Sequence, residues 1–190
     1  MKRYIIFLLS TMVVFGVCAQ EENSVDSQTT KKLTKEQKIE QRKAEEEATA
    51  KMVAWMVENR QFVLEAEYLS DKSGERIIVN QTINFIMIDS LNITIQLAST
   101  SGIGGANGMG GITTDGTITK WEVKKTGKTS NNYSIHLLAM THIGTYDIFI
   151  DVSPYAKADA RISGNTSGKL NYHGRMVPIS QTRVYKGMSI

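Results

Sequence analysis

The segment “FVLEAEYLSDKSGE”, residues 62–75, combines the period-two pattern of a β-strand with a strong turn signal. Its side chains alternate between two faces, with Phe62, Leu64, Ala66 and Tyr68 on one and Val63, Glu65, Glu67 and Leu69 on the other. Such alternation is typical of a half-buried strand, and the polar “SDKSGE” is typical of a turn. The sequence therefore predicts that a β-domain begins here and extends over residues 60–190.

Eight further segments have the same short, apolar-rich pattern, and turn residues such as Asp115-Gly116 separate them. They are residues 76–80, 82–89, 92–98, 117–125, 133–140, 146–152, 158–163 and 169–174. Nothing after Gln61 alternates strands with helices, which argues against a doubly wound α/β fold. We expect an α+β, mostly β protein, with an antiparallel sheet of about nine strands that forms a sandwich or an open, curved barrel.

A single amphipathic helix is predicted upstream of the sheet, at residues 34–59. Thr34 and Gln37 fit a capping box, and no Gly or Pro occurs before Asn59. Residues 35–49 are mostly polar and lack a sustained heptad seam, so we expect them to stand in solvent. The second half is predicted to pack on the sheet through an apolar stripe of Met52, Val53, Trp55 and Met56.

The beginning of the chain, residues 1–19, has the three parts of a secretory signal peptide. Lys2 and Arg3 are the positive region, residues 4–17 are mostly apolar, and small residues lead to Ala19. The apolar run is shorter than the ~20 residues of a membrane span. We expect cleavage after Ala19 and a periplasmic or secreted protein whose mature chain has no transmembrane span.

Cys18 provides an alternative route of export, in which the chain is cut before the cysteine and acylated on it. The preceding residue is Val17, whereas a lipoprotein normally has Gly, Ala or Ser there, so cleavage after Ala19 is favoured. The mature chain then has no cysteine, which excludes disulfides, thiolate metal sites and a cysteine nucleophile. Residues 20–33 are polar and are predicted to be a disordered leader.

The charge and the histidines exclude two classes of function. The formal net charge is +3, and the predicted signal peptide accounts for two of these charges, so nucleic-acid binding is not expected. The three histidines, His136, His142 and His173, form no H-x-x-H or H-E-x-x-H pattern. The sequence therefore predicts no metal site.

Two glycine-containing segments require comparison with phosphate-binding loops. “GIGGANGMGG”, residues 102–111, has no G-x-G-x-x-G register and precedes a strand pattern. “TGKTS”, residues 126–130, has Glu122 where a P-loop needs glycine. No nucleotide or other cofactor is therefore expected. The first segment is a candidate flexible binding loop through Gly102, Gly104, Gly105, Gly108, Gly110 and Gly111.

No catalytic residues are predicted. Glu65 and Glu67 share a strand face, as do Asp147 and Asp151, but alternation already places polar residues on a solvent face. Glycosidase carboxylates instead flank a substrate cleft, usually from different elements. The chain also lacks the G-x-S-x-G pattern of serine hydrolases.

Residues 55–180 resemble the domain of unknown function family 4251, a family of exported bacterial proteins found mainly in Bacteroidetes. The most specific pieces are Phe62 to Ala66 and Tyr172 to Gly174. This resemblance implies export and a charged helix followed by a β-rich domain, and it supplies no catalytic residues. Where the family usually has aromatic residues with glycine, this chain has “STSGIGGANGMGG”, residues 99–111.

Two functions of different classes remain. The first is a non-enzymatic cell-envelope module that binds a small molecule, a glycan or a partner protein in a β-lined groove. The second is a hydrolase acting on envelope or dietary glycans. An apolar pocket would favour the first function, and convergent carboxylates around a deep cleft would favour the second.

Overall fold

The computed structural model describes residues 34–71, 74–98, 111–126, 131–164 and 169–189. The predicted signal peptide and leader, residues 1–33, lie outside the described residues. In chain order the elements are α1 (Lys35–Asn59), β1 (Gln61–Ser70), β2 (Arg76–Ile78), β3 (Phe85–Asp89), β4 (Asn92–Leu97), β5 (Ile112–Thr126), β6 (Asn132–Thr141), β7 (Gly144–Val152), β8 (Lys157–Gly164), β9 (Lys169–Val177) and the 3-10 helix η1 (Ile179–Gln181).

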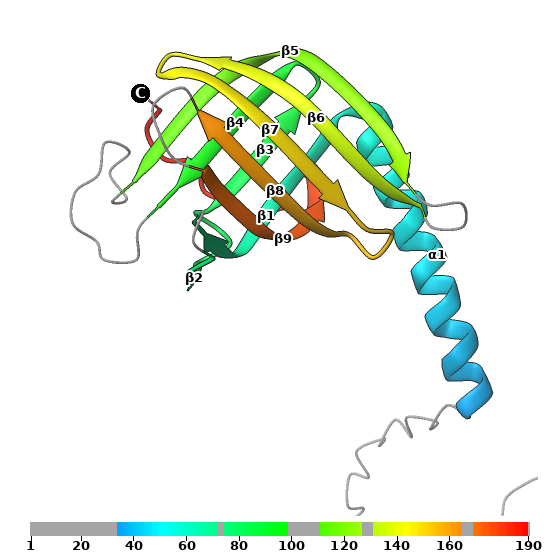
Figure 1. Cartoon of the computed structure of the whole chain (residues 1–190). Coiled ribbons are helices and arrows are strands. Elements are labelled where there is room, and N and C mark those ends of the chain that lie inside the picture. The colour runs from blue at the N-terminus through cyan, green and yellow to red at the C-terminus, as the bar shows by residue number, and fades with distance from the viewer. Residues whose placement is uncertain (1–33, 72–73, 99–110, 127–130, 165–168, 190) are drawn as a thin grey trace, which may run out of the picture. The chain divides into compact units, whose positions relative to one another are not determined.

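The two halves of α1 differ in burial. The side chains of its first half are exposed, whereas Val53, Met56 and Val57 are buried. These three positions follow the i, i+3, i+4 spacing of one helix face. They belong to the same apolar cluster as the barrel interior, so the last turns of α1 cover the end of the barrel at which β1 begins (Figure 1).

The expectation that Trp55 packs on the sheet is wrong, because this residue is 49% exposed. At about 100° per residue, Trp55 lies about 200° around the helix from Val53, outside the narrow buried face. The helix ends at Asn59, the following Arg60 adopts a left-handed conformation (φ 54°), and β1 starts at Gln61. Counting every apolar residue in the last turns of the helix therefore predicts a docked face that is wider than the one observed.

The nine strands form one antiparallel sheet in the order β2-β1-β3-β4-β5-β6-β7-β8-β9. β1 also pairs with β9, from Val63 opposite Val177 to Ser70 opposite Asn171, which closes eight strands into a barrel (Figure 1). β2 is an extra strand that pairs with the end of β1, beyond the residues that pair with β3. The helix and the antiparallel sheet are as predicted, and the sheet closes on itself instead of remaining open.

Two irregularities bend strands in the closed sheet. The β1–β9 register shifts between Ala66 and Tyr68, and the β5–β6 register shifts between Ile118 and Lys120. Such β-bulges increase local twist and bend the strand that carries them. Closure then pairs the edges that an open sheet would leave free.

The turn predicted at Asp115-Gly116 is wrong, because both residues lie within the continuous strand β5. A Cβ atom at Gly116 would lie 2.4 Å from the main-chain oxygen of Met140 on β6. Glycine here therefore permits a close approach of two backbones, which the turn-like dipeptide does not distinguish from a turn.

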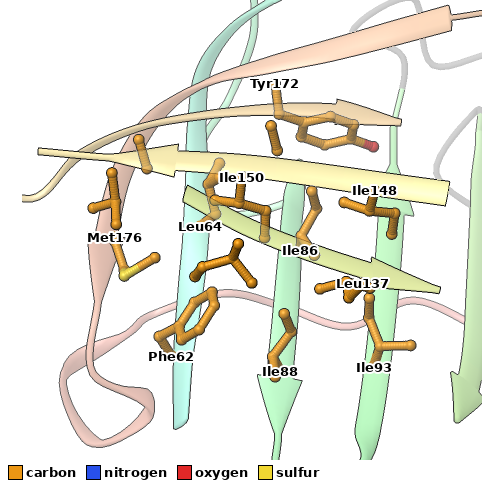
Figure 2. Close-up of a cluster of buried hydrophobic side chains, with 14 of the residues drawn as sticks. Phe62, Leu64, Ile86, Ile88, Ile93, Leu137, Ile148, Ile150, Tyr172 and Met176 are labelled. Atoms are coloured by element: carbon orange, nitrogen blue, oxygen red, sulfur yellow. The ribbon is translucent and has the colours of Figure 1, made fainter. Parts of the chain in front are cut away.

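The core fills the inside of the barrel with aliphatic and aromatic side chains from opposite walls (Figure 2). The inward set labelled there is Phe62, Leu64, Ile86, Ile88, Ile93, Leu137, Ile148, Ile150, Tyr172 and Met176, and all ten are almost completely buried. Because successive residues of a strand point to opposite faces, these side chains recur at alternate positions.

The C-terminal segment, residues 178–189, crosses the outer face of the barrel. The amide of Tyr185 donates to the carbonyl of Thr82 (2.7 Å), and Gln96 Nε2 donates to the carbonyl of Tyr185 (2.8 Å). The amide of Gly187 donates to Gln96 Oε1 (2.8 Å). These bonds fasten the segment to β4 and to the residues just before β3, where the polar side chain of Gln96 is fully buried.

Candidate functional site

The barrel contains a cavity at the end opposite α1, with a volume of about 350 Å³. We call it the barrel cavity, and its lining comprises Ile95, Leu97, Ile112, Thr114, Tyr146, Ile162, Gly164, Lys169, Leu170 and Tyr172. These residues come from β4, β5, β7, β8 and β9. These described lining residues are mainly apolar, and none of them is acidic.

Strand register explains why these side chains face inward. Ile95, a member of the interior cluster, lies opposite Thr114 on the neighbouring strand. Cross-strand partners point to the same face of a sheet, so Thr114 also points into the barrel. The next inward pair toward the open end is Leu97 and Ile112. The cavity wall is therefore two layers of side chains deep along β4 and β5.

Tyr146 lies against Gly164, its neighbour across β7 and β8. A Cβ atom at Gly164 would be 3.0 Å from the Tyr146 ring, which is tighter than an ordinary contact. The missing side chain at position 164 thus leaves room for this aromatic ring in the cavity wall. Burial raises the pKa of Tyr146 above its usual value, so the phenol is neutral at physiological pH.

The fully buried Tyr172 is the deepest aromatic side chain of the lining. Its hydroxyl donates a hydrogen bond to the main-chain carbonyl of Gln96 (3.0 Å). Burial, and secondarily the nearby Tyr146, raise the pKa of Tyr172 well above its usual value. This part of the wall is consequently uncharged, and its polar atom is satisfied.

Thr114 is only 2% exposed, and its hydroxyl has no hydrogen-bond partner among the described residues. The adjacent Thr113 points to the other face, where its hydroxyl donates to Gln96 Oε1 (3.0 Å). A buried hydroxyl without a partner costs about 1–3 kcal/mol. A molecule in the cavity that offers a hydrogen-bonding group to Thr114 would remove this cost.

Lys169 is the only cation among the described residues that line the cavity. In the part of the chain that the structure describes, no carboxylate lies within ion-pair distance of its ammonium group. The barrel cavity can therefore hold a molecule with an apolar body, a hydrogen-bonding group near Thr114 and a polar or anionic group near Lys169.

The predicted glycine loop meets this region at one described residue. Gly102, Gly104, Gly105, Gly108 and Gly110 lie outside the described residues, whereas Gly111 directly precedes the cavity residue Ile112. A Cβ atom at Gly111 would lie 1.9 Å from the carbonyl oxygen of Leu97, so the two backbones can approach only without a side chain here.

The histidines are dispersed over the outside of the barrel. His136 Nε2 lies 2.7 Å from Asp147 Oδ1, and His173 Nδ1 lies 2.6 Å from Asp159 Oδ1. His142 occupies the turn between β6 and β7. Across the described ranges, no group of three or more His, Cys, Asp or Glu side chains could hold a metal ion.

The carboxylates singled out from the sequence do not converge on the cavity. Glu65 Oε1 accepts a hydrogen bond from the Thr182 hydroxyl (2.6 Å), and Asp151 lies 3.4 Å from the Arg161 guanidinium. Glu67 borders a separate groove on the outer wall. These environments differ from one another, so the shared strand positions predicted by alternation do not create an acid pair.

Sequence reasoning missed the cavity residues themselves. Thr114 lies in the strand-like segment before the strand expected at residues 117–125, and Tyr146 and Tyr172 lie in expected strands, Tyr172 also within the family-like piece Tyr172 to Gly174, but none of these patterns links the three residues to a cavity. Alternation along β7 and β9 gives the face of each tyrosine, but the cavity depends on side chains from five strands. The unpaired state of Thr114 has no signal in the sequence.

Within the described residues, no helix combines the length and apolar character needed to span a membrane.

Comparisons with known proteins are consistent with this fold. The family model described as Domain of unknown function (DUF4251) matches residues 28–176. A solved structure similar to this chain is that of a DUF4251 family protein from Bacteroides eggerthii, with a TM-score of 0.62 and 23% sequence identity over 73% of this chain and 93% of that chain. No curated protein sequence matches the chain.

Proposed function

Because the chain belongs to the DUF4251 family, whose description names no activity, we propose a function from the geometry of the barrel cavity. We propose that the protein is an exported cell-envelope protein that binds a small, mainly apolar molecule in this cavity. The observation that carries the proposal is an apolar hollow in which the hydroxyl of Thr114 has no partner within the described chain.

The size and composition of the cavity support a small-molecule ligand. Its volume of about 350 Å³ is at the lower end of the range for ligand pockets, about 300–1,000 Å³. Such pockets are mostly apolar, with a few polar groups that fix orientation. Thr114 and Lys169 have that role here, and the aliphatic and aromatic wall supplies the affinity.

Hydrolysis of glycans has less support than binding. A glycoside hydrolase requires two carboxyl groups, one on either side of the substrate, and none of the lining residues that the structure describes carries one. Its walls also have few donors and acceptors for the many hydroxyl groups of a sugar. An apolar molecule with one or two polar groups fits the lining better than a glycan.

Export is the second part of the proposal. It rests on Lys2, Arg3 and the apolar residues 4–17, followed by cleavage after Ala19. The intact mass of the exported protein tests it: a chain beginning at Gln20 is expected. A mass that includes a diacylglyceryl group on Cys18 would contradict cleavage after Ala19 and would show that the protein is anchored to a membrane by lipid.

Binding is tested by fluorescence titration with 1-anilinonaphthalene-8-sulfonate, which combines aromatic rings with an anionic group. We expect saturable binding at one site per chain. Leu170→Trp should fill the cavity and weaken binding at least tenfold. Ile39→Trp, in the exposed half of α1, is the matched control and should leave affinity unchanged. Equal affinity of both variants, with both folded, would contradict the proposed site.

A further inference from the structure

The outer wall of the barrel carries two histidine–aspartate pairs that the barrel cavity does not use. In the first, His136 pairs with Asp147 (2.7 Å), and its ring stacks on Phe149 with centroids 4.3 Å apart. In the second, His173 pairs with Asp159 (2.6 Å), and the hydroxyl oxygen of Ser70 lies 3.0 Å from the other ring nitrogen. The other ring nitrogen of His136 lies 3.5 Å from Glu122 Oε2, so the two histidines differ in that one faces a second carboxylate and the other faces a hydroxyl.

The strand pairing of β1, β9 and β8 assembles this second cluster. His173 on β9 lies opposite Tyr68 of β1 and opposite Asp159 of β8. Ser70, two residues after Tyr68, shares the face of Tyr68 because side chains alternate along a strand. Three neighbouring strands therefore place serine, histidine and aspartate side by side, although Ser70 and His173 are 103 positions apart in sequence.

The hydrogen bonds assign a role to each nitrogen of His173. Nδ1 faces the Asp159 carboxylate, which accepts a hydrogen bond and therefore favours the tautomer with the proton on Nδ1. Nε2 is then the acceptor for the hydroxyl proton of Ser70. The amide of Asn171 donates to Ser70 Oγ (3.2 Å), which directs the hydroxyl proton away from Asn171. This is the arrangement of nucleophile, base and orienting acid that serine hydrolases use.

We propose that Ser70, His173 and Asp159 form a nucleophilic site that hydrolyses carboxylic esters. This activity goes beyond binding in the barrel cavity and does not require that the cavity hold a ligand. Ser70 is the nucleophile, His173 is the general base and acid, and Asp159 orients the imidazole. The G-x-S-x-G pattern belongs to serines that lie on a strand-to-helix turn. Ser70 lies at the end of a strand, so this pattern is not expected around it.

Two aromatic and cationic contacts support the site. The Tyr68 ring stacks on the His173 ring, with centroids 4.5 Å apart and an angle of 14° between the planes, which restrains the imidazole. Arg76 on β2 lies opposite Ser70, and its guanidinium is 5.0 Å from the Tyr68 ring centroid. Its positive charge is therefore on the face where the carbonyl oxygen of an ester would become negative.

Space for a substrate lies beside the histidine and aspartate of the cluster. His173 and Asp159 line the outer groove, of about 430 Å³, which also contains Tyr68, Lys157 and Arg175. A second hollow, of about 300 Å³, is formed by Leu69, Leu97 and Leu170 on the opposite face of β1, because Leu69 belongs to the interior cluster while Ser70 points outward. The polar, charged outer groove fits an ester with a polar alcohol, and this is the substrate class that we assign.

The reaction balances without a cofactor. Ser70 Oγ attacks the ester carbonyl carbon as His173 Nε2 takes the hydroxyl proton, and the tetrahedral intermediate then expels the alcohol, which receives this proton. Water attacks the resulting acyl-serine and gives a proton to His173. The carboxylic acid leaves as the proton returns to Ser70 Oγ. No atom changes its oxidation state.

The test is active-site labelling of the purified full chain with an alkyl fluorophosphonate, followed by intact mass and peptide mapping. Ser70 should displace fluoride from phosphorus and gain one adduct per chain, and Ser70→Ala should gain none. Because general-base catalysis contributes about 10²–10⁴-fold, His173→Gln should slow labelling at least 100-fold. The matched control is His136→Gln, at the other histidine–aspartate pair, and it should label at the wild-type rate.

Turnover of p-nitrophenyl butyrate supplies the second measurement. Ser70→Ala should abolish the protein-dependent rate, whereas Arg76→Gln should lower kcat with little change in KM, since its charge acts in the transition state. Thermal unfolding checks that each variant is folded. The proposal is overturned if folded wild-type protein gains no adduct on Ser70, if His173→Gln labels as fast as wild type, or if Ser70→Ala retains the full hydrolysis rate.

Discussion

The two ends of the barrel are built from the same kind of strand and differ in what occupies the interior. At the end where β1 begins, Phe62 and Met176 join Val53, Met56 and Val57 of α1 in one buried cluster. At the other end, the inward side chains line a cavity of about 350 Å³. A closed barrel of eight strands leaves an interior that side chains can fill or a small ligand can occupy. The filled end supplies much of the buried core, and the hollow end is where we propose that a ligand binds.

This comparison predicts unequal costs for removing side chains. Phe62→Ala should lower the free energy of unfolding by about 3–5 kcal/mol, the usual cost of truncating a buried aromatic residue. Ile112→Ala, at the cavity rim where the residue is already 43% exposed, should cost about 1 kcal/mol or less. Urea denaturation of both variants measures the difference. Similar losses at the two positions would contradict a division between a filled end and a hollow end.

The helix α1 provides a second contrast, between two neighbouring residues that differ in burial. Met56→Ala should cost about 2–5 kcal/mol, because Met56 is fully buried against the barrel. Trp55→Ala should cost about 1 kcal/mol or less, because the indole is half-exposed. Denaturant midpoints of the two variants decide the orientation of the helix. A larger loss for the tryptophan would show that α1 docks through a different face.

Two adjacent threonines test the polar part of the cavity. Thr114→Val should raise the free energy of unfolding by about 1 kcal/mol, because it removes a buried hydroxyl that has no partner in the described chain. Thr113→Val should lower it by about 1 kcal/mol, because the hydrogen bond to Gln96 is lost. Equal destabilisation by both substitutions, measured by thermal unfolding, would mean that Thr114 is already satisfied.

Asp115 gives the smallest expected effect, on the attachment of the C-terminal segment. Burial alone would raise its pKa, but hydrogen bonds from Lys186, Ser189 and Thr94 outweigh burial and lower the pKa of this carboxyl. A carboxyl with a lowered folded pKa stabilises the protein above its unfolded pKa, and this contribution is lost as the pH falls through the folded value. The protection factor of the Tyr185 amide, in which the exchange rate is corrected for the intrinsic pH dependence of exchange, should therefore fall below about pH 4.

Asp115→Asn is the control for that experiment. It should remove most of the acid-dependent change at Tyr185, because the ionisable group is gone while the hydrogen-bond acceptor is retained in part. An unchanged pH dependence in this variant would assign the effect to another carboxyl group. The ion pair that this experiment addresses joins Lys186 Nζ to Asp115 Oδ2 at a distance of 2.6 Å.

Local patterns predicted the elements well, because their physical causes are local. Alternation identified the inward residues Phe62 and Leu64, and the helix formers before Asn59 identified α1. Alternation failed for Val63, which it places on the same face as Glu65 and Glu67 but which is fully buried outside the interior cluster. The C-terminal segment binds to the outer face of this sheet, and nothing in the strands themselves signals such a cover.

The sites depend on pairings between distant strands and were therefore not predictable from single segments. Closure joins β1 to β9 and brings Ser70 to within 3.0 Å of His173 Nε2. The cavity likewise requires the register of five strands and the small residue Gly164, which accommodates Tyr146. Family membership supports the fold and leaves both sites to be tested by experiment.

The central claim, that the barrel cavity is a binding site, is tested most directly by methyl NMR of isoleucine-labelled protein during titration with decanoate. The methyl signals of Ile95, Ile112 and Ile162, which line the cavity, should shift and saturate together. Those of Ile88 and Ile135, which are buried away from the cavity lining, should remain in place. Equal shifts of all five residues, or no saturable shift of the first three, would contradict the account.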